Sequence, residues 1–141
     1  MVLTPLKEQL MRHEGVRLKP YRDSVGILTI GCGRNLEGTG LTYDEAMFLL
    51  DNDIQRVMRE LRKRLSWWAG LDPTRWQVLI NMAFNLGVGG LLKFKNMLAD
   101  LEGGNYEHAA KEMLDSDWAI QVGARATELA EQMRTGQRVE G

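Results

Sequence analysis

Two carboxylates and one hydroxyl near the N-terminus have the types and spacing that acid–base chemistry requires. Eight residues separate Glu14 from Asp23, and five residues separate Asp23 from Thr29. If a helix ends at Glu14 and a hairpin follows, all three side chains can face one wall of a cleft. Two carboxylates and a hydroxyl in a cleft are suited to hydrolysis of a glycosidic bond. On spacing alone, ordinary surface acids and a strand-forming threonine are the better explanation, because any chain contains many such pairs.

The expected position of each of these residues indicates a role. The C-terminal end of a helix dipole disfavours negative charge, so Glu14 is better placed to be the general acid. A turn aspartate is usually solvated and ionised, which suits Asp23 to act as a base or to stabilise charge. The hydroxyl of Thr29 can hold a water molecule against Asp23.

The surrounding patterns predict the elements that position these residues. Thr4-Pro5 is typical of a helix start, with threonine as the cap, and Gly15 of a left-handed stop, so we expect a helix that ends at Glu14. Residues 18–36 change to a strand pattern, and the segment Asp23-Ser24-Val25-Gly26 predicts a hairpin turn between two short strands.

The remainder of the chain is predicted to be helical. Thr42 and Glu45 form a capping-box pattern that opens one long amphipathic helix, roughly 43–65. Asp72-Pro73 opens another helix, which Gly87 and Gly89-Gly90 are expected to end. Shorter helices are predicted at about 91–102, 106–114 and 124–134.

Three blocks of sequence resemble the phage lysozyme (endolysin) family of muramidases. The first block contains Arg12-His13-Glu14-Gly15, then LKPYRD at 18–23 and LTIGCG at 28–33, and so carries a glutamate, an aspartate and a threonine at the family's spacing. The second block, 79–87, looks like the family's central helix and the turn after it. The third block, 118–136, is similar to its C-terminal region. The resemblance spans nearly the whole chain.

The resemblance implies an α+β, mostly helical, lysozyme-like fold with two lobes. Residues 1–141 would form a single catalytic domain with a small β-hairpin lobe at about 15–41 and a long connecting helix. A helical C-terminal lobe at about 66–141 would include the N-terminal helix.

The resemblance also implies a reaction and a set of site residues. The reaction is hydrolysis of the β-1,4 bond between N-acetylmuramic acid and N-acetylglucosamine in peptidoglycan, with inversion at the anomeric carbon. Glu14 would be the acid, and Asp23 and Thr29 would position the attacking water. Arg125 aligns with a basic residue that faces the glutamate in relatives, and Met97 and Glu112 fall at or near sugar contacts. The residues assigned to substrate binding are Phe84, Asn35 and Arg125.

The composition excludes several other classes of protein. Among 141 residues, 18 are basic and 19 acidic, which gives a net charge of -1 and argues against nucleic-acid binding. The longest apolar run, 46–50, is too short for a membrane span, and the charged N-terminus lacks a signal-peptide pattern. We expect a monomer made in the cytoplasm, without membrane insertion, that reaches peptidoglycan after the membrane has been permeabilised.

Metal and thiol chemistry are not expected from the sequence. His13 and His108 are isolated along the chain, with no third ligand at metal spacing, so we expect no metal and no cofactor. Cys32 lies between glycines and has no histidine at a recognisable spacing, so a small packed or half-exposed thiol is favoured over a catalytic one.

Two other functions remain open. A lytic transglycosylase uses one glutamate and no water and leaves an anhydro product, and the presence of Asp23 and Thr29 argues against it. A wall-binding helical module without activity is the second alternative, and the intact set of Glu14, Asp23 and Thr29 argues against that.

Overall fold

The computed structural model describes residues 3–139, and the chain divides into two compact units at the boundary between Leu50 and Asp51. Within the described residues there are seven α-helices, one short 3-10 helix and one three-stranded sheet. This composition confirms the predicted α+β, mostly helical class. We call residues up to Leu50 the first unit and residues from Asp51 the second unit, and we describe each by itself.

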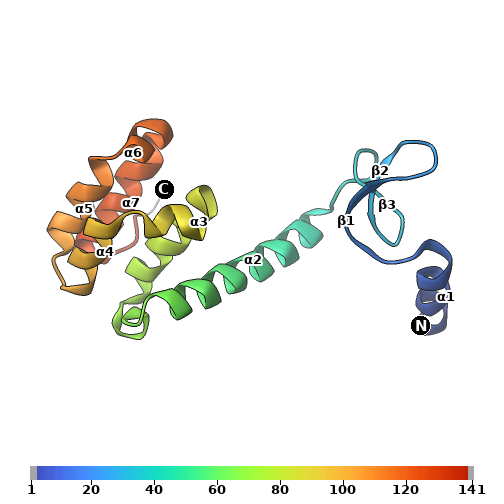
Figure 1. Cartoon of the computed structure of the whole chain (residues 1–141), viewed down its shortest axis with the longest axis horizontal. Coiled ribbons are helices and arrows are strands. Elements are labelled where there is room, and N and C mark those ends of the chain that lie inside the picture. Colours follow the sequence, from blue (N-terminus) through green and yellow to red (C-terminus); the bar gives the residue numbers. More distant parts are fainter. Residues whose placement is uncertain (1–2, 140–141) are drawn as a thin grey trace. The chain divides into compact units, whose positions relative to one another are not determined.

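The first unit contains one helix and the sheet. Helix α1 (Thr4–Glu14) ends at the predicted residue and leads directly into strand β1 (Arg17–Arg22), as Figure 1 shows. Strands β2 (Leu28–Gly31) and β3 (Arg34–Asn35) complete an antiparallel sheet in the order β1-β2-β3. Thr4 was expected to cap α1, but it lies inside the helix, and Leu3 precedes it without a side-chain cap.

The hairpin between β1 and β2 follows the predicted turn. The amide of Gly26 donates to the Asp23 carbonyl at 3.0 Å, and the Asp23 amide donates to the Ile27 carbonyl at 2.9 Å. Gly26 has a φ of 87°, a conformation that suits glycine and closes a three-residue hairpin loop. The turn therefore fixes Asp23 at the end of β1, opposite Ile27.

The long helix α2 (Tyr43–Arg64) crosses the boundary between the two units and begins with the predicted capping box. The Thr42 amide donates to Glu45 Oε1 at 2.8 Å, and the Glu45 amide donates to Thr42 Oγ1 at 3.1 Å. These two bonds satisfy backbone donors that the first turn of a helix leaves free.

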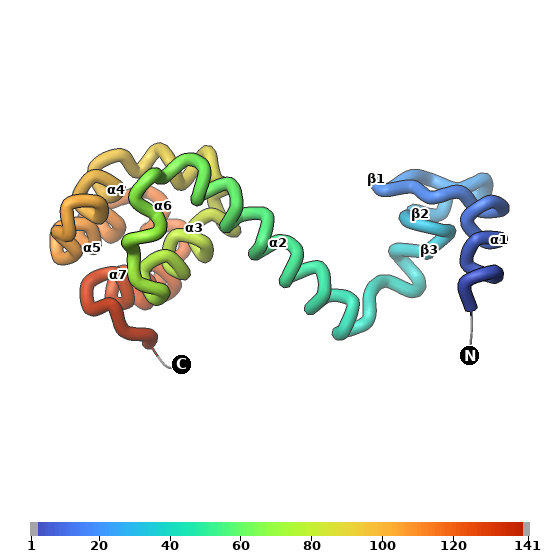
Figure 2. Tube along the Cα trace, turned by 90° about the horizontal axis from the view of Figure 1, so that it is seen from below, coloured from blue at the N-terminus to red at the C-terminus, as the bar shows by residue number. Residues whose placement is uncertain are grey.

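The second unit consists of the end of α2 and a cluster of shorter helices, whose Cα trace folds back on itself so that α3 and α7 lie side by side (Figure 2). Helix α5 packs against α4 and α7. Asp72, Asn105 and Ser116 cap the helices that follow them. The elements are η1 (Trp68–Gly70), α3 (Pro73–Leu92), α4 (Lys95–Glu102), α5 (Tyr106–Leu114), α6 (Asp117–Val122) and α7 (Ala124–Thr135).

The predicted end of the helix at Gly87 is confirmed, because Gly87 interrupts the helical geometry with a φ of 76°. Gly89-Gly90 do not end it, contrary to expectation, since a short helical stretch runs through them to Leu92. The helix predicted to start at residue 91 therefore begins at Lys95. Helix α6 was not predicted, because six residues are too few to show a helical period.

The apolar core lies in the second unit. Every buried apolar side chain among residues 3–139 belongs to residues 57–133, and Leu79, Met113 and Leu129 are examples that are at most 2% exposed. Trp118 is also buried, and its indole N–H donates to Asn85 Oδ1 at 2.8 Å.

Arg75 is a buried cation that links two helices of the second unit. Its Nε donates to the Met133 carbonyl at 2.7 Å and its Nη2 to the Arg134 carbonyl at 3.1 Å, so it satisfies backbone acceptors near the end of α7. Its Nη1 pairs with Asp72 at 3.0 Å, and the guanidinium lies 3.4 Å from the ring centroid of Tyr106.

Membrane-spanning potential is limited to one pair of helices. Among residues 3–139, no single helix is both long and apolar enough to cross a membrane. Helices α3 and α4 reach the required length and composition only together, and they are bent by 97° at their junction.

Candidate active site

Glu14 lies at the end of α1 and reaches across to the turn between β2 and β3. A Cβ atom built on Gly33 would lie 3.3 Å from Glu14 Oε2, so the carboxyl group rests closely over the Gly33 backbone. Gly33 has a φ of 86°, which a side chain would strain in addition to crowding the carboxyl group. The absence of a side chain at Gly33 therefore sets where the Glu14 carboxyl group can lie.

Asp23 is held by its own turn. Its Oδ1 accepts hydrogen bonds from the amides of Val25 and Ile27, both at 2.9 Å. Because both bonds go to one oxygen, Oδ2 is left for another partner. The carboxyl group is therefore oriented by the backbone while half of its acceptor capacity is kept for chemistry.

Thr29 is 3% exposed and lies on β2, where it pairs with Tyr21 of β1 and Asn35 of β3. Its hydroxyl donates to the Ile27 carbonyl at 2.8 Å. The hydroxyl oxygen can therefore only accept a hydrogen bond from any further partner. Asp23 and Thr29 therefore both hydrogen-bond to the backbone of Ile27, Asp23 to its amide and Thr29 to its carbonyl.

A hollow of 610 Å³ opens beside β2 and β3 within the first unit. Asn35 lines it, and the Asn35 Oδ1 accepts from the Gly38 amide at 2.7 Å, which leaves the side-chain N–H₂ group free to donate. Cys32 also lines this hollow and is exposed, which excludes a packed thiol and agrees with the half-exposed alternative. Its neighbours in the chain are glycines, which have no side chains to cover it. The lining residues are Ile30, Gly31, Cys32, Gly33, Arg34, Asn35, Thr39, Leu41 and Glu45.

Arg34 and Glu45 form an ion pair that the sequence analysis did not identify. Arg34 Nη1 donates to Glu45 Oε1 at 2.8 Å and to the Gly40 carbonyl at 3.0 Å, and Nη2 also pairs with Glu45 Oε2. The hydrogen bond from Arg34 is the main cause that lowers the pKa of Glu45 to about 2, with the Thr42 amide as the next cause. The pair ties the end of the sheet to the start of α2.

The substrate-binding candidates of the second unit lie on α3 and α7. The Phe84 ring on α3 is 41% exposed. Arg125 on α7 donates from Nη2 and Nε to Asn81 Oδ1 at 2.7 and 3.0 Å, and from Nη2 to the Asn81 carbonyl at 3.1 Å. Met97, which falls at or near a sugar-contact position of the family, was not assigned to substrate binding, and it is fully buried in the core.

His108 is not isolated in the fold, contrary to the expectation from its sequence spacing. Its Nδ1 lies 2.5 Å from Asp100 Oδ2, and its Nε2 lies 3.7 Å from Glu112 Oε1. The spacing of Glu112, four residues further on α5, could have been a signal. Asp100 could not be identified in this way, because it lies on α4.

The chain is similar to proteins named as lysozymes and endolysins and to a phage spike protein. The model of the family described as phage lysozyme matches residues 11–135. The pre-baseplate central spike protein Gp5 of Enterobacteria phage T4 is 31% identical over 93% of this chain, although the match spans only 28% of the spike protein. A probable T4-type lysozyme 1 of Dictyostelium discoideum is 29% identical over 96% of both chains. The endolysin of Salmonella phage P22 is 31% identical over 75% of this chain and 76% of its own length. On sequence, this chain belongs to the phage lysozyme family.

Proposed function

We propose that this protein is an endolysin-type muramidase that hydrolyses the β-1,4 bond between N-acetylmuramic acid and N-acetylglucosamine in peptidoglycan. Membership of the phage lysozyme family supports a lysozyme-type activity. The observation that carries the finer proposal is the arrangement in the first unit, where Glu14 rests over Gly33 while Asp23 and Thr29 are both bound to Ile27.

The role of each catalytic side chain follows from the hydrogen bonds that it can still form. Glu14 donates its proton to the oxygen of the glycosidic bond as that bond breaks. A water molecule donates one hydrogen to Asp23 Oδ2 and the other to Thr29 Oγ1, because both atoms have acceptor capacity left. Such a water has its lone pairs directed away from both residues, toward the anomeric carbon. Asp23 takes the proton as the water attacks.

This arrangement gives inversion at the anomeric carbon. A single displacement by water places the acid and the base on opposite sides of the sugar ring, with their carboxyl groups about 6.5–9.5 Å apart. Phe84, Asn35 and Arg125 are the proposed sugar contacts. The exposed ring of Phe84 offers a stacking surface, and Asn35 offers a free amide donor beside the hollow.

The reaction products test the proposal. Purified peptidoglycan is digested, the new reducing ends are reduced with borohydride, and the fragments are identified by mass spectrometry. Reduced N-acetylmuramic acid ends are expected. Reduced N-acetylglucosamine ends would contradict the assigned bond, and anhydro ends would indicate the lytic transglycosylase alternative. Proton NMR of the first product anomer, before mutarotation, tests inversion.

The acid role is tested by Glu14→Gln, which keeps the size of the side chain but cannot donate a proton. We expect activity on peptidoglycan to fall by about 10²–10⁴-fold, the usual contribution of a general acid. Glu8→Gln is the matched control, since Glu8 is an exposed glutamate on the same helix. Full activity of Glu14→Gln would refute the assignment. A wild-type chain that does not cleave purified walls would instead support the inactive wall-binding module.

A second candidate function is that of a wall-cleaving domain within a larger assembly. The spike protein Gp5 favours it, because the match to Gp5 covers more of this chain than the match to the endolysin of phage P22 does. Expression of the chain together with a membrane-permeabilising protein distinguishes the two. Lysis from within supports the endolysin, whereas activity on isolated walls without lysis from within supports the assembly.

A further inference from the structure

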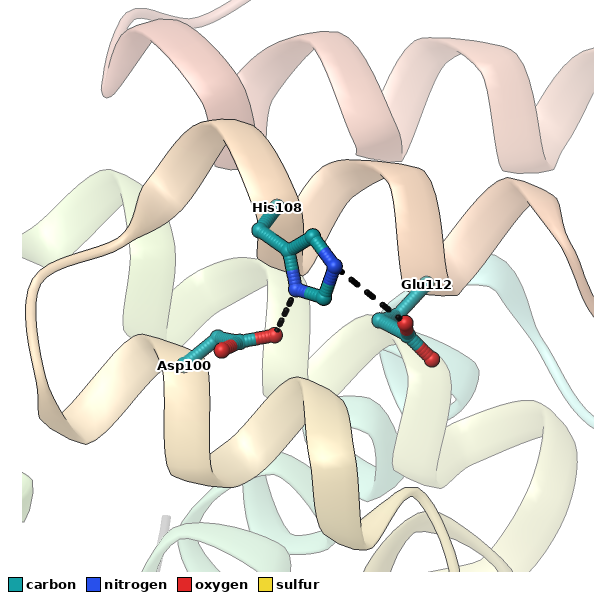
Figure 3. Close-up of side chains that lie close together, drawn as sticks. All are labelled: Asp100, His108 and Glu112. Carbon is teal, nitrogen blue, oxygen red and sulfur yellow. Dashed lines mark hydrogen bonds and ion pairs between the residues drawn. The ribbon is translucent and has the colours of Figure 1, made fainter.

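Asp100, His108 and Glu112 form a cluster on the second unit that the proposed cell-wall chemistry does not use. His108 and Glu112 lie one turn apart on α5, and Asp100 reaches the same imidazole from α4, as Figure 3 shows. One possible ligand atom from each residue lies within 4.8 Å of the others. The side chains of Asp100 and Glu112 are 22% and 33% exposed, so the cluster is at the surface but partly enclosed.

The contact with Asp100 decides which nitrogen of His108 is free. An ionised carboxylate can only accept a hydrogen bond, so the short Nδ1 to Oδ2 contact of 2.5 Å requires the proton on Nδ1. In the neutral ring, Nε2 then carries a lone pair. This lone pair faces Glu112, whose Oε1 lies 3.7 Å away, beyond hydrogen-bond distance.

The gap between Nε2 and Oε1 fits one transition-metal ion. A zinc ion lies about 2.0–2.1 Å from a histidine nitrogen and about 2.0–2.2 Å from a carboxylate oxygen, so one ion can bridge two ligand atoms up to about 4.1 Å apart. A ligand separation of 3.7 Å requires no backbone movement. Asp100 then occupies the position of the carboxylate that commonly orients a metal-binding histidine through its other nitrogen.

We propose that His108 Nε2 and Glu112 Oε1 bind a divalent transition metal of the zinc class, with Asp100 holding the imidazole in place and water completing the coordination. The nitrogen ligand favours zinc over magnesium or calcium, which prefer oxygen ligands only. Glu112 also lines a hollow of 230 Å³ between the start of α4 and the α5–α6 turn, which offers space for water. The bound ion stabilises the folded second unit by mass action.

The test is isothermal titration calorimetry of ZnCl₂ into the full chain, with Cys32→Ser as background because Cys32 is an exposed thiol. Asp100 is the main cause that raises the pKa of His108, with a further contribution from Glu112 and opposition from Lys111. Measurements are therefore made at pH 8 to limit proton competition. One saturable site is expected, with no comparable binding of MgCl₂ and with an increase in melting temperature.

Variants identify the ligands. His108→Gln is expected to abolish the site, Glu112→Gln to weaken it at least about tenfold, and Asp100→Asn to weaken it by about 10–100-fold. His13→Gln is the matched control, since the sequence has only two histidines, and Glu102→Gln controls for loss of an acid on α4. Binding that survives His108→Gln, or no saturable zinc binding in the background chain, would overturn the proposal. Long-range ¹⁵N NMR of the imidazole checks that zinc shifts Nε2 and not Nδ1.

Discussion

The two units of the protein are ordered by different interactions. In the second unit, helices α3 to α7 bury a continuous apolar core that includes Leu79, Met113 and Leu129. In the first unit, taken by itself, Thr29 is the only buried side chain among residues 3–50. Side-chain hydrogen bonds stabilise its backbone instead: Asp23 and Asn35 accept from turn amides, Thr29 donates to a carbonyl, and the Thr42–Glu45 pair caps the start of α2.

This difference between the two units predicts which substitutions change activity and which change the free energy of unfolding. A unit ordered by polar side chains can present carboxylates and hydroxyls at fixed positions, because the same groups that do chemistry also tie the backbone. Asp23 and Thr29 illustrate this, since each bonds to Ile27. We expect substitutions in the apolar core of the second unit to change stability with little effect on the rate per folded molecule. Substitutions near Glu14 should lower the rate per folded molecule with little effect on stability.

The largest effect on stability is expected from Leu79→Ala. Leu79 is fully buried on α3, and removal of a buried leucine side chain typically costs about 2–5 kcal/mol through lost burial and a residual cavity. Urea denaturation followed by circular dichroism measures the free energy of unfolding. Leu114→Ala on α5 is the matched control, because Leu114 is 48% exposed and should cost well under about 1 kcal/mol. If both variants lose equal stability, the second unit does not depend on this core.

Arg75→Met tests whether a buried polar contact contributes as much to the free energy of unfolding as the apolar core does. The variant leaves the Met133 and Arg134 carbonyls without their donor, which should destabilise the protein by about 1–3 kcal/mol. The comparison is Arg59→Met, an exposed helical arginine on α2, which should change the free energy of unfolding by less than about 0.5 kcal/mol. Specific activity per folded molecule should be unchanged in both.

Local sequence signals predicted the structure well, whereas contacts between distant residues could not be predicted. The capping box at Thr42 and the turn at Asp23 depend on residues within four positions of each other, and both were confirmed. The two carbonyls that accept from Arg75 lie 58 and 59 residues away, and no spacing indicates them.

For the candidate site too, the sequence could predict the residues but not the contacts that they make. The family resemblance selected Glu14, Asp23 and Thr29, and the structure adds which oxygen of Asp23 is free and in which direction the Thr29 hydroxyl donates. Those details depend on the backbone of Ile27, which carries no sequence signal for function. The Asp100 contact to His108 was missed because the two residues lie on different helices.

Gly33→Ala should separate activity from stability in the first unit. The new Cβ atom would lie 3.3 Å from Glu14 Oε2 and would displace that carboxyl group, so we expect activity on peptidoglycan to fall by about 10–100-fold. Backbone strain at positive φ should cost about 1 kcal/mol. Gly104→Ala carries similar strain, at a φ of 79°, with no atom near the new Cβ, and should keep full activity. An equal loss of activity in both variants would show that strain, not displacement of Glu14, is responsible.

The smallest effect is expected from the pH dependence of the Arg34–Glu45 pair. Because the pKa of Glu45 is lowered to about 2 in the folded chain, from an ordinary value of 4.5, the ionised pair stabilises the fold above pH 4.5. That contribution is lost as pH falls from 4.5 through 2. In Glu45→Gln the side chain can still accept the Thr42 amide but forms no ion pair with Arg34. The urea midpoint should therefore fall less between pH 5 and pH 3 in this variant than in the wild type.

Glu37→Gln is the control, because its pair with Arg22 is more exposed, at 3.3 Å, and should contribute little. The same acid-induced fall in the wild type and Glu45→Gln would mean that the first unit does not depend on this pair.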